Sequence, residues 1–340
     1  MTDSDLKRPE LKNYGSYLAN NEAVAADVRL KLELLWNLRS AMRDRGYVEA
    51  PMPVLHATRE GAPIHQFTTE NPVTGSRYYL RHCMEDHLKR LVPVIPRLFE
   101  LGKAIRVEVE DLARAEEFLV LEAVAGDVTF EQGCQLVLDV LHDALQRTFG
   151  DVRFEAFDLG SARSVAFDDL AAEALGVDPG LADGALVKES RRWLVANAPQ
   201  EPSEDATDWA LMEDFMKYAV EPLCTVPTML KGFPPALRHI SPIDPTTGRA
   251  ERFALVSSGI EFCDGGMKFS SVDEYREVYE NNARLREVLL GVTDNDLPED
   301  FFADLGASPR SVFTFGLGVD RLFALIKGCS IHDIIQFPHH

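Results

Sequence analysis

The chain has 340 residues and a formal net charge of −20, from 35 Lys and Arg against 55 Asp and Glu. Its 46% hydrophobic and 26% charged residues are typical of a globular protein with a substantial core. The charge argues against a nonspecific nucleic-acid binder, which needs a basic surface, and no apolar run approaches the ~20 residues that cross a bilayer. The five cysteines are scattered without a CxxC pair, and the first residues lack a signal peptide's apolar core, so we expect a cytoplasmic protein with reduced thiols.

The first elements predicted are an arm, a helix and an edge segment. Residues 1–24 are polar and aperiodic, and we expect them to form an N-terminal arm. From Val24 apolar residues recur along one helical face, and Gly46 ends the pattern. Residues 47–55 contain two prolines, which indicates an extended segment at the edge of a sheet or at an interface.

The rest of the chain predicts strands in hairpins, interrupted by helices. In chain order, we expect a helix over 84–91, strands over 97–110 and 117–127 joined as a long antiparallel hairpin, a helix over 130–149, a mostly helical insertion at about 155–235, strands over 252–264 and 311–315, a tight turn at 316–318 and a helix over 319–327. Hairpin spacing, rather than βαβ spacing, indicates an α+β fold with a mainly antiparallel sheet flanked by helices.

Three of these strands carry charged residues that a core does not need. Arg106 and Glu108 are two apart, so their side chains leave the same face of an extended segment. Glu122 and Glu261 each lie within an otherwise apolar strand, where an unpaired buried carboxylate is costly. For each glutamate alone a structural ion pair or a solvated face is the favoured interpretation. Together with the arginine they favour a cleft.

The segment from Arg77 to Arg106 holds seven basic and three acidic residues, a local charge of +4 in an acidic chain. Such a field suits an anionic ligand such as ATP. The alternative, a basic face paired with acidic neighbours, is equally compatible with the composition. The sequence has no P-loop, and Gly316-Leu-Gly318 lacks the third glycine of a dinucleotide fingerprint.

Taken in order, these residues resemble the three motifs of class II aminoacyl-tRNA synthetases. GYVEAPMP, ending at Pro53, is similar to the first motif; Arg106-Val-Glu108, Arg114 and Glu117-Phe118 are similar to the second; GLGVDRLFAL, with Arg321, is similar to the third. RYYLRHCMEDHLKRLV, EEFLVLEA, ERFALVSSGIE and IHDIIQFP bring the resemblance closer to the lysine, aspartate and asparagine subgroup. It covers residues 25–340, which we expect to form one catalytic domain and a homodimer, without room for the subgroup's anticodon-reading domain.

The resemblance implies a role for each matching residue. Arg106, Glu108 and Arg321 would be catalytic and, with Arg114, Phe118 and Glu261, would bind ATP; Glu261 would also hold Mg²⁺. Glu122 would receive the substrate's α-amino group, in an amino-acid pocket shared with Gly61, Glu85, Gly265 and Lys268. The implied chemistry is attack of a carboxylate on the α-phosphorus, for which a protein supplies alignment and charge neutralisation.

Three positions depart from the subgroup's pattern. Ala254 stands where the subgroup has an acidic metal ligand, for which Glu251 or water would compensate, or catalysis would be impaired. Val124 replaces an aromatic residue. Lys268 stands where lysyl-type enzymes carry a glutamate for the substrate ammonium, and a cation there would attract a carboxylate. The alternative is that Lys268 only neutralises Glu85.

We therefore expect an ATP-dependent ligase that adenylates an amino acid with an acidic or carboxamide side chain. The acyl group would pass to a small amine or a protein rather than to tRNA, since the acidic chain would repel a tRNA body. Three alternatives stay open: a lysine or β-lysine ligase acting on an elongation factor, an asparagine-synthetase-type amide ligase, and a non-catalytic regulatory paralogue.

Overall fold

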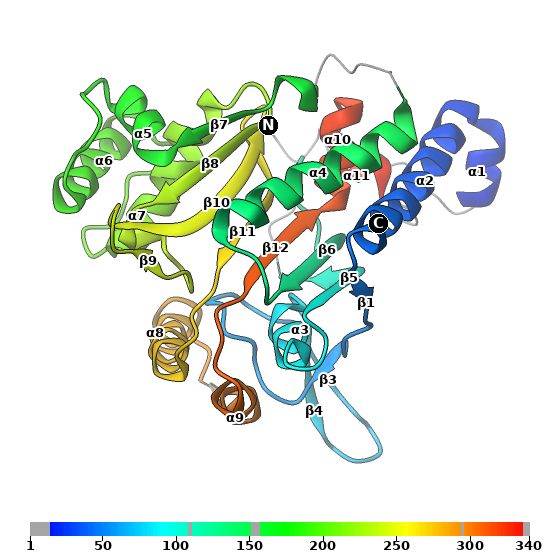
Figure 1. Ribbon diagram of the computed structural model, residues 1–340, viewed down its shortest axis with the longest axis horizontal. Coiled ribbons are helices and arrows are strands. Elements are labelled where there is room, and N and C mark those ends of the chain that lie inside the picture. Colours follow the sequence, from blue (N-terminus) through cyan, green and yellow to red (C-terminus); the bar gives the residue numbers. More distant parts are fainter. Residues whose placement is uncertain (1–13, 108–110, 151–156, 294–295, 336–340) are drawn as a thin grey trace.

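The computed structural model describes residues 14–107, 111–150, 157–293 and 296–335 (Figure 1). Its strands are β1 Val48–Glu49, β2 Leu55–His56, β3 Thr68–Glu70, β4 Arg77–Leu80, β5 Arg97–Ile105, β6 Glu117–Ala125, β7 Arg163–Ala166, β8 Thr228–Phe233, β9 Ile243–Asp244, β10 Arg249–Ser257, β11 Ile260–Met267 and β12 Phe313–Gly318. Its α-helices are α1 Tyr14–Asn20, α2 Glu22–Asp44, α3 Glu85–Leu91, α4 Phe130–Phe149, α5 Phe167–Leu175, α6 Asp183–Asn197, α7 Asp208–Phe215, α8 Val272–Leu290, α9 Glu299–Ala307, α10 Val319–Lys327 and α11 Ile331–Ile334.

The main sheet has the strand order β1-β5-β6-β12-β11-β10-β8-β7, and β9 pairs with β10. From β5 to β8 in this order, each strand is antiparallel to the next. The two edge strands are parallel to their neighbours: β1 to β5, and β7 to β8. β2, β4 and β3 form a small separate sheet. The α+β fold with a mainly antiparallel sheet is therefore confirmed.

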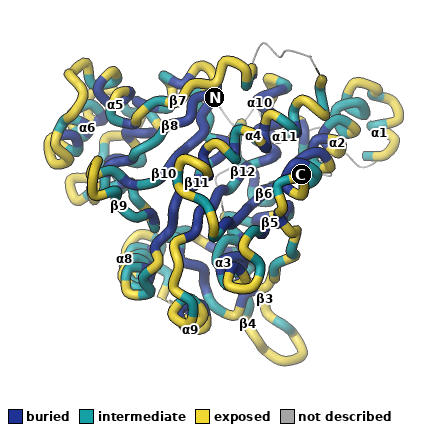
Figure 2. The backbone as a smooth tube through the Cα atoms, in the orientation of Figure 1, coloured by how far each residue is buried: buried dark blue, intermediate teal, exposed yellow. Residues whose placement is uncertain are grey.

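Helices cover the two faces of the main sheet differently. On one face Phe99, Leu121 and Phe313 pack in the same core cluster as residues of α2, α4 and α10. The other face packs against α3 near β5 and β6, and against α5–α7 near β8 and β10. Figure 2 shows that the central strands are buried along most of their length, with exposed residues mainly on the outer surfaces of helices. The middle of this second face is thus left for a site.

Local signals explain most of the boundaries. α4 begins at a capping box formed by Thr129 and Gln132, and ends at Gly150. The β5–β6 hairpin has continuous register from the pair Ile105 and Glu117 to the pair Arg97 and Ala125, in agreement with the long antiparallel hairpin predicted here. The predicted helices over 130–149 and 319–327 match α4 and α10.

Two predictions about strands are wrong. The segment 252–264 is not one strand: Ser258 and Gly259 have φ of 52° and 73°, and they reverse the chain between β10 and β11. The glycines at 316 and 318 do not form a turn either, because β12 continues through them and pairs with β6 as far as Gly318. Both errors have one cause. A glycine can lie in a turn or within a strand that closely approaches its neighbour, and the sequence alone does not show which, because this depends on the partner strand.

The segment predicted as a mostly helical insertion contains α5, α6 and α7, and it also contributes β7 and β8 to the main sheet. At the N-terminus, the described part of the predicted arm forms α1 and the start of α2. None of the described helices is long and apolar enough to cross a membrane. All five cysteines lie in the described part of the chain and are unpaired.

Candidate active site

A row of paired residues across four strands forms the floor of a cavity. Glu122 on β6 pairs with Gly316 on β12, Gly316 with Asp264 on β11, and Asp264 with Ala254 on β10. Paired residues project from the same face of a sheet, so Glu122 and Asp264 stand about 10 Å apart, two strand spacings, with a glycine between them. A Cβ built on Gly316 would lie 3.8 Å from an Asp264 oxygen and from Cγ of Glu122. The floor between the two carboxylates is therefore open to a ligand.

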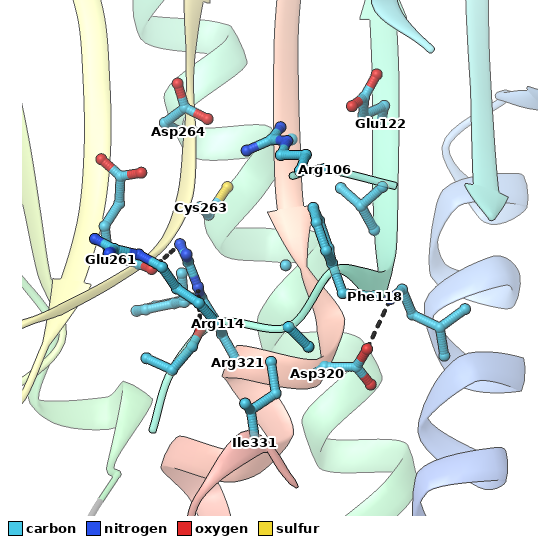
Figure 3. Close-up of a pocket in the computed structure, with 17 residues that line it drawn as sticks. Arg106, Arg114, Phe118, Glu122, Glu261, Cys263, Asp264, Asp320, Arg321 and Ile331 are labelled. Carbon is cyan, nitrogen blue, oxygen red and sulfur yellow. Dashed lines mark hydrogen bonds between the residues drawn. The ribbon is translucent and has the colours of Figure 1, made fainter. Parts of the chain in front are cut away.

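Three arginines from separate segments surround this floor (Figure 3). Arg106 follows β5, Arg114 lies in the β5–β6 connection, and Arg321 lies in the first turn of α10. All three line the same cavity, which has a volume of about 670 Å³ including the part open to solvent. Glu122, Glu261, Asp264 and Phe118 line it as well. Such clustered guanidinium groups favour a ligand with several negative charges, such as a nucleotide triphosphate.

Arg106 and Arg321 are held in different ways. Arg106 donates from Nε to the His82 carbonyl at 3.3 Å, and its guanidinium carbon lies 5.2 Å from the centre of the Phe118 ring. No carboxylate is paired with it among the described residues, so its charge is available to an anion. Arg321 donates to the carbonyls of Ala113 at 2.9 Å and Glu261 at 3.1 Å, which joins α10 to β11 and to the connection before β6.

A buried ion pair supports the start of α10 next to Arg321. Lys31 Nζ lies 2.5 Å from Oδ1 of Asp320, and both side chains are 4% exposed. The other Asp320 oxygen accepts the Leu119 amide of β6 at 2.7 Å, while Lys31 also donates to the Ile334 carbonyl at 2.9 Å. This pair joins α2, β6, α10 and α11 behind the cavity.

Glu122 lies at the inner end of the cavity, where it accepts the Met84 amide at 2.6 Å. Burial raises the pKa of Glu122 to about 8, and the nearby Glu85 acts in the same direction. A bound ammonium group would stabilise the ionised carboxylate and lower this pKa. The geometry thus suits the role expected for Glu122, receiving an α-amino group.

A charged cluster beyond Glu122 forms one wall next to α3. Glu85 lies 2.8 Å from Lys89 and 3.8 Å from Lys268, and it accepts the Thr314 hydroxyl at 2.9 Å. Burial acts to raise the pKa of Glu85, but Lys268 and Lys89 outweigh it and lower that pKa to about 2. Lys89 is also 3.2 Å from Asp86. Lys268 is also buried, with its side chain 9% exposed, but it has fewer acidic partners than Lys89. The 3.8 Å contact with Glu85 is its one ion pair among the described residues.

A second network, which the sequence did not reveal, anchors the loop after β2. Glu60 accepts the His82 amide at 2.7 Å and the Gln66 side chain at 3.0 Å, and its other oxygen lies 3.4 Å from the Cys83 thiol. Glu60, His82 and Cys83 are metal-ligating types within 4.8 Å of one another. Burial acts to raise the pKa of Glu60, yet the neighbouring histidines lower it to about 2. Since these hydrogen bonds satisfy the Glu60 carboxylate, we interpret the network as a loop anchor.

The structure brings six of the expected residues to the cavity and places the others elsewhere. Arg106, Arg114, Phe118, Glu122, Glu261 and Arg321 line it together. Glu85 and Lys268 lie in the neighbouring charged cluster. Glu108 lies outside the described residues.

The two glycines expected in the amino-acid pocket are both closely packed. A Cβ on Gly61 would meet the Tyr279 ring at 2.3 Å, so α8 packs directly against the loop. A Cβ on Gly265 would meet the Thr314 carbonyl at 2.2 Å, because β12 fills that space. Strand packing therefore accounts for Gly265, whose role in binding an amino acid stays a prediction.

Glu251 does not take the place of the missing acid at Ala254. It lies on the opposite face of β10, where it lines another cavity with Lys231 and Arg249. The residues that sequence reasoning missed are Asp264, Gly316 and Asp320. Asp264 had a signal, since it is a carboxylate in an apolar strand like Glu261. Glu261 and Asp264 offer carboxylate oxygens to the cavity, which are the donors that Mg²⁺ prefers.

A family model described as tRNA synthetases class II (D, K and N) matches residues 10–340. The chain belongs to this family. The three arginines stand in the motifs by which the sequence resembles this family.

The synthetase-like chain has curated relatives of modest identity. It is 28% identical to a lysine–tRNA ligase of Enterococcus faecalis, over 96% of this chain and 66% of that ligase. It is 29% identical to the lysylphosphatidylglycerol biosynthesis bifunctional protein LysX of Mycobacterium avium, over 94% of this chain and 28% of that protein. The chain therefore spans less than two thirds of either relative.

The raised pKa of Glu122 predicts a pH-dependent stability. The folded protein holds this proton more tightly than the unfolded chain, in which the carboxyl pKa is near 4.5. The stabilisation from Glu122 is therefore full below about pH 4.5 and is lost as the pH rises through about 8. Glu122→Gln removes this loss, so the melting temperature of the variant minus that of the wild type should increase between pH 5.5 and pH 9.

Thermal unfolding across that range tests the prediction. Glu117→Gln is the control, because Glu117 lies on the same strand but pairs at the surface with Lys103. A difference between Glu122→Gln and wild type that is constant with pH would contradict the prediction.

Proposed function

We propose that the chain activates an amino acid by adenylation with ATP and passes the acyl group to an acceptor amine. The observation that carries the proposal is the cavity in which Arg106, Arg114 and Arg321 face a floor bounded by Glu122. One oxygen of the substrate carboxylate forms a bond to the α-phosphorus as the bond to the pyrophosphate oxygen breaks. Such a reaction requires positioning and charge neutralisation rather than a covalent nucleophile.

Each group of residues has a defined part in this proposal. Arg106 neutralises charge on the α-phosphate and the substrate carboxylate, and Glu122 holds the α-ammonium group. Arg114 and Arg321 bind the remaining phosphates, and Glu108 is assigned to the adenine by resemblance alone. Mg²⁺ would be held by Glu261 and would supply neutralisation of the phosphate charge.

We further propose that the substrate side chain carries a carboxylate or a carboxamide. Lys268 supports this, because within the described part of the chain its buried ammonium group has one ion pair, the 3.8 Å contact with Glu85, and so has donors for another acceptor. A substrate ammonium group would instead meet two lysines, since Lys89 also contacts Glu85. Glu85 and Asp86 would attract it, but Lys89 lies within 3.2 Å of both.

Lysine is the second candidate substrate. Both relatives described above have lysine or a lysyl group in their names, and Glu85, the residue that would attract an ammonium group, is present in this chain. The charge on Lys268 favours the first candidate. The two differ only in the side-chain pocket, and both require the same ATP cavity.

ATP–pyrophosphate exchange with each standard amino acid and with β-lysine separates these candidates. We expect exchange with an acidic amino acid or its amide, and none with lysine. Exchange with lysine or β-lysine alone would support the second candidate. The absence of exchange with every amino acid, in protein shown by circular dichroism to be folded, would contradict adenylation of these substrates.

For the acceptor we propose a small amine or a protein lysine. The net charge of −20 would repel the phosphates of a tRNA. Of the basic residues from Arg77 to Arg106, Arg106 lines the cavity, while five others pair with acidic neighbours: Arg81, Lys89, Arg90, Arg97 and Lys103. Transfer of a radiolabelled acyl group to bulk tRNA, measured by acid precipitation, would contradict this assignment. We expect no such transfer, and rapid discharge of the adenylate by an added amine.

We also propose that two copies of the chain associate through α2. Leu32 and Trp36 are four residues apart on α2, and Trp36 is 65% exposed. The short strand β1 lies beside α2 (Figure 1). Its residue Val48 is exposed as well, which extends the apolar surface. An exposed apolar surface of this kind is typical of an interface.

Trp36→Glu is therefore expected to convert a dimer into a monomer at micromolar concentration, measured by sedimentation equilibrium. Val195→Glu is the control, since Val195 is an exposed apolar residue on the distant α6. An unchanged mass of the Trp36→Glu variant would exclude this face as the interface.

A further inference from the structure

The subgroup's pattern has an acidic metal ligand on β10 where this chain has Ala254, and the structure excludes the nearest acid in sequence. Glu251 lies on the other face of β10 and lines a separate cavity. Ala254 itself is fully buried among apolar side chains of the α5–α7 cluster. A second carboxylate for a divalent cation must therefore come from another strand.

Asp264 occupies the position next to the missing ligand. It is the direct partner of Ala254 in the β10–β11 register, so the two Cβ atoms project from the same face, about 5 Å apart. Its partner on the other side is Gly316 of β12. Its direct partners on the two neighbouring strands are thus an alanine and a glycine, which are small and leave room beside the Asp264 carboxylate. It is 43% exposed and lines the cavity.

A β-bulge places Glu261 on the same face as Asp264. Leu255 pairs with Cys263, but the next residue, Val256, pairs with Glu261, so Phe262 is an extra residue in β11. Without this extra residue, strand alternation would direct Glu261 to the face opposite Asp264. Figure 3 shows the carboxylates of Glu261 and Asp264 on the same side of the cavity.

Neither carboxylate is fully paired within the protein. The Glu261 side chain has no ion pair or hydrogen bond among the described residues. Asp264 has one contact, at 4.0 Å, with Arg252. Arg252 is itself engaged by the Leu237 carbonyl at 3.2 Å and by the Phe233 ring at 4.5 Å. Two carboxylates so close together favour a bound cation, and oxygen donors are suited to Mg²⁺.

We propose that Asp264, on β11, supplies the carboxylate ligand that Ala254 lacks on β10. Asp264 and Glu261 then hold the divalent cation that accompanies the nucleotide phosphates. Compared with the subgroup's pattern, the carboxylate ligand lies on the adjacent strand, β11 instead of β10, on the same face of the sheet. This inference rests on the proposed function for the identity of the cation and its nucleotide.

Binding of Mn²⁺ in the presence of a non-hydrolysable ATP analogue, followed by electron paramagnetic resonance, tests the assignment without requiring turnover. Asp264→Asn keeps the shape of the side chain and removes its charge. It should weaken Mn²⁺ binding at least about tenfold, as should Glu261→Gln. Glu251→Gln is the matched control and should bind as the wild type does.

Unchanged Mn²⁺ affinity in Asp264→Asn, or absence of Mn²⁺ binding by the wild type with the analogue, would overturn the inference.

These measurements distinguish failure of the Asp264 assignment from failure of the proposed adenylation activity. Wild-type exchange activity with unchanged Mn²⁺ binding in Asp264→Asn would reject the ligand and keep adenylation. Mn²⁺ binding that depends on Asp264, in a protein inactive with every amino acid, would support the ligand and reject adenylation.

Discussion

Replacing Arg106 with alanine is expected to lower amino-acid-dependent ATP–pyrophosphate exchange by about 100- to 1,000-fold. Arg106 lines the cavity between Glu122 and Asp264, and no carboxylate neutralises it among the described residues. Its charge is therefore available to the non-bridging oxygens of the α-phosphate, which carry the negative charge as the phosphorus becomes pentacoordinate. Because this interaction strengthens in the transition state, we expect kcat to fall more than the KM for ATP rises.

Two variants make the result interpretable. Arg106→Lys keeps the positive charge but loses the planar pair of donors. Its exchange activity should lie between those of Arg106→Ala and the wild type. Arg192→Ala removes an exposed arginine of α6 and should leave exchange unchanged. Full exchange activity in a folded Arg106→Ala variant would exclude the catalytic role.

Replacing Lys268 with glutamate is expected to change the relative preference for an acidic amino acid over lysine by at least about 100-fold. The substitution would place a carboxylate beside Glu85 in a pocket where only Lys89 balances it. Juxtaposed like charges cost several kcal/mol, enough to reject an acidic substrate and to admit a cationic one. Exchange rates with aspartate, glutamate and lysine, each as kcat/KM, measure the preference.

The neutral variants separate binding of the substrate from neutralisation of Glu85. If Lys268 only neutralises Glu85, the double variant Glu85→Gln with Lys268→Met should recover activity toward the same amino acid. If Lys268 binds the substrate side chain, the double variant should stay as inactive as Lys268→Met. Recovery with unchanged preference would reject the pocket assignment.

Much of the fold could be predicted from patterns within single elements. The helical period from Val24, the amphipathic pattern over 130–149 and the hairpin of β5 and β6 depend on neighbouring residues, and the structure matches them. The β10–β11 turn was missed because the positive φ at Ser258 has no strong sequence signal. The register between strands could not be derived at all, since it depends on contacts between distant segments.

The candidate site could likewise be predicted only where the signal lay within a single strand. Charged residues within apolar strands indicated Glu122 and Glu261, and both line the cavity. The role of Gly316 could not be seen, because it follows from lying between Glu122 and Asp264 in the sheet. The sequence also could not show that Glu251 lies away from the site, because the register of strand pairing decides which side of the sheet a residue occupies. The loop anchor at Glu60 depends on His82 and Cys83, which lie more than twenty residues away.

One helix connects the outer surface of the molecule to its nucleotide cavity. α2 exposes Leu32 and Trp36 outward, and directly beside Leu32 it buries Lys31 against Asp320, the neighbour of Arg321. A movement of α2 on association would therefore act on Asp320, which precedes the arginine that we propose to bind phosphate. If the proposed dimer forms through this helix, nucleotide affinity and self-association are thermodynamically linked: ATP should tighten the dimer by the same factor by which dimerisation tightens ATP binding.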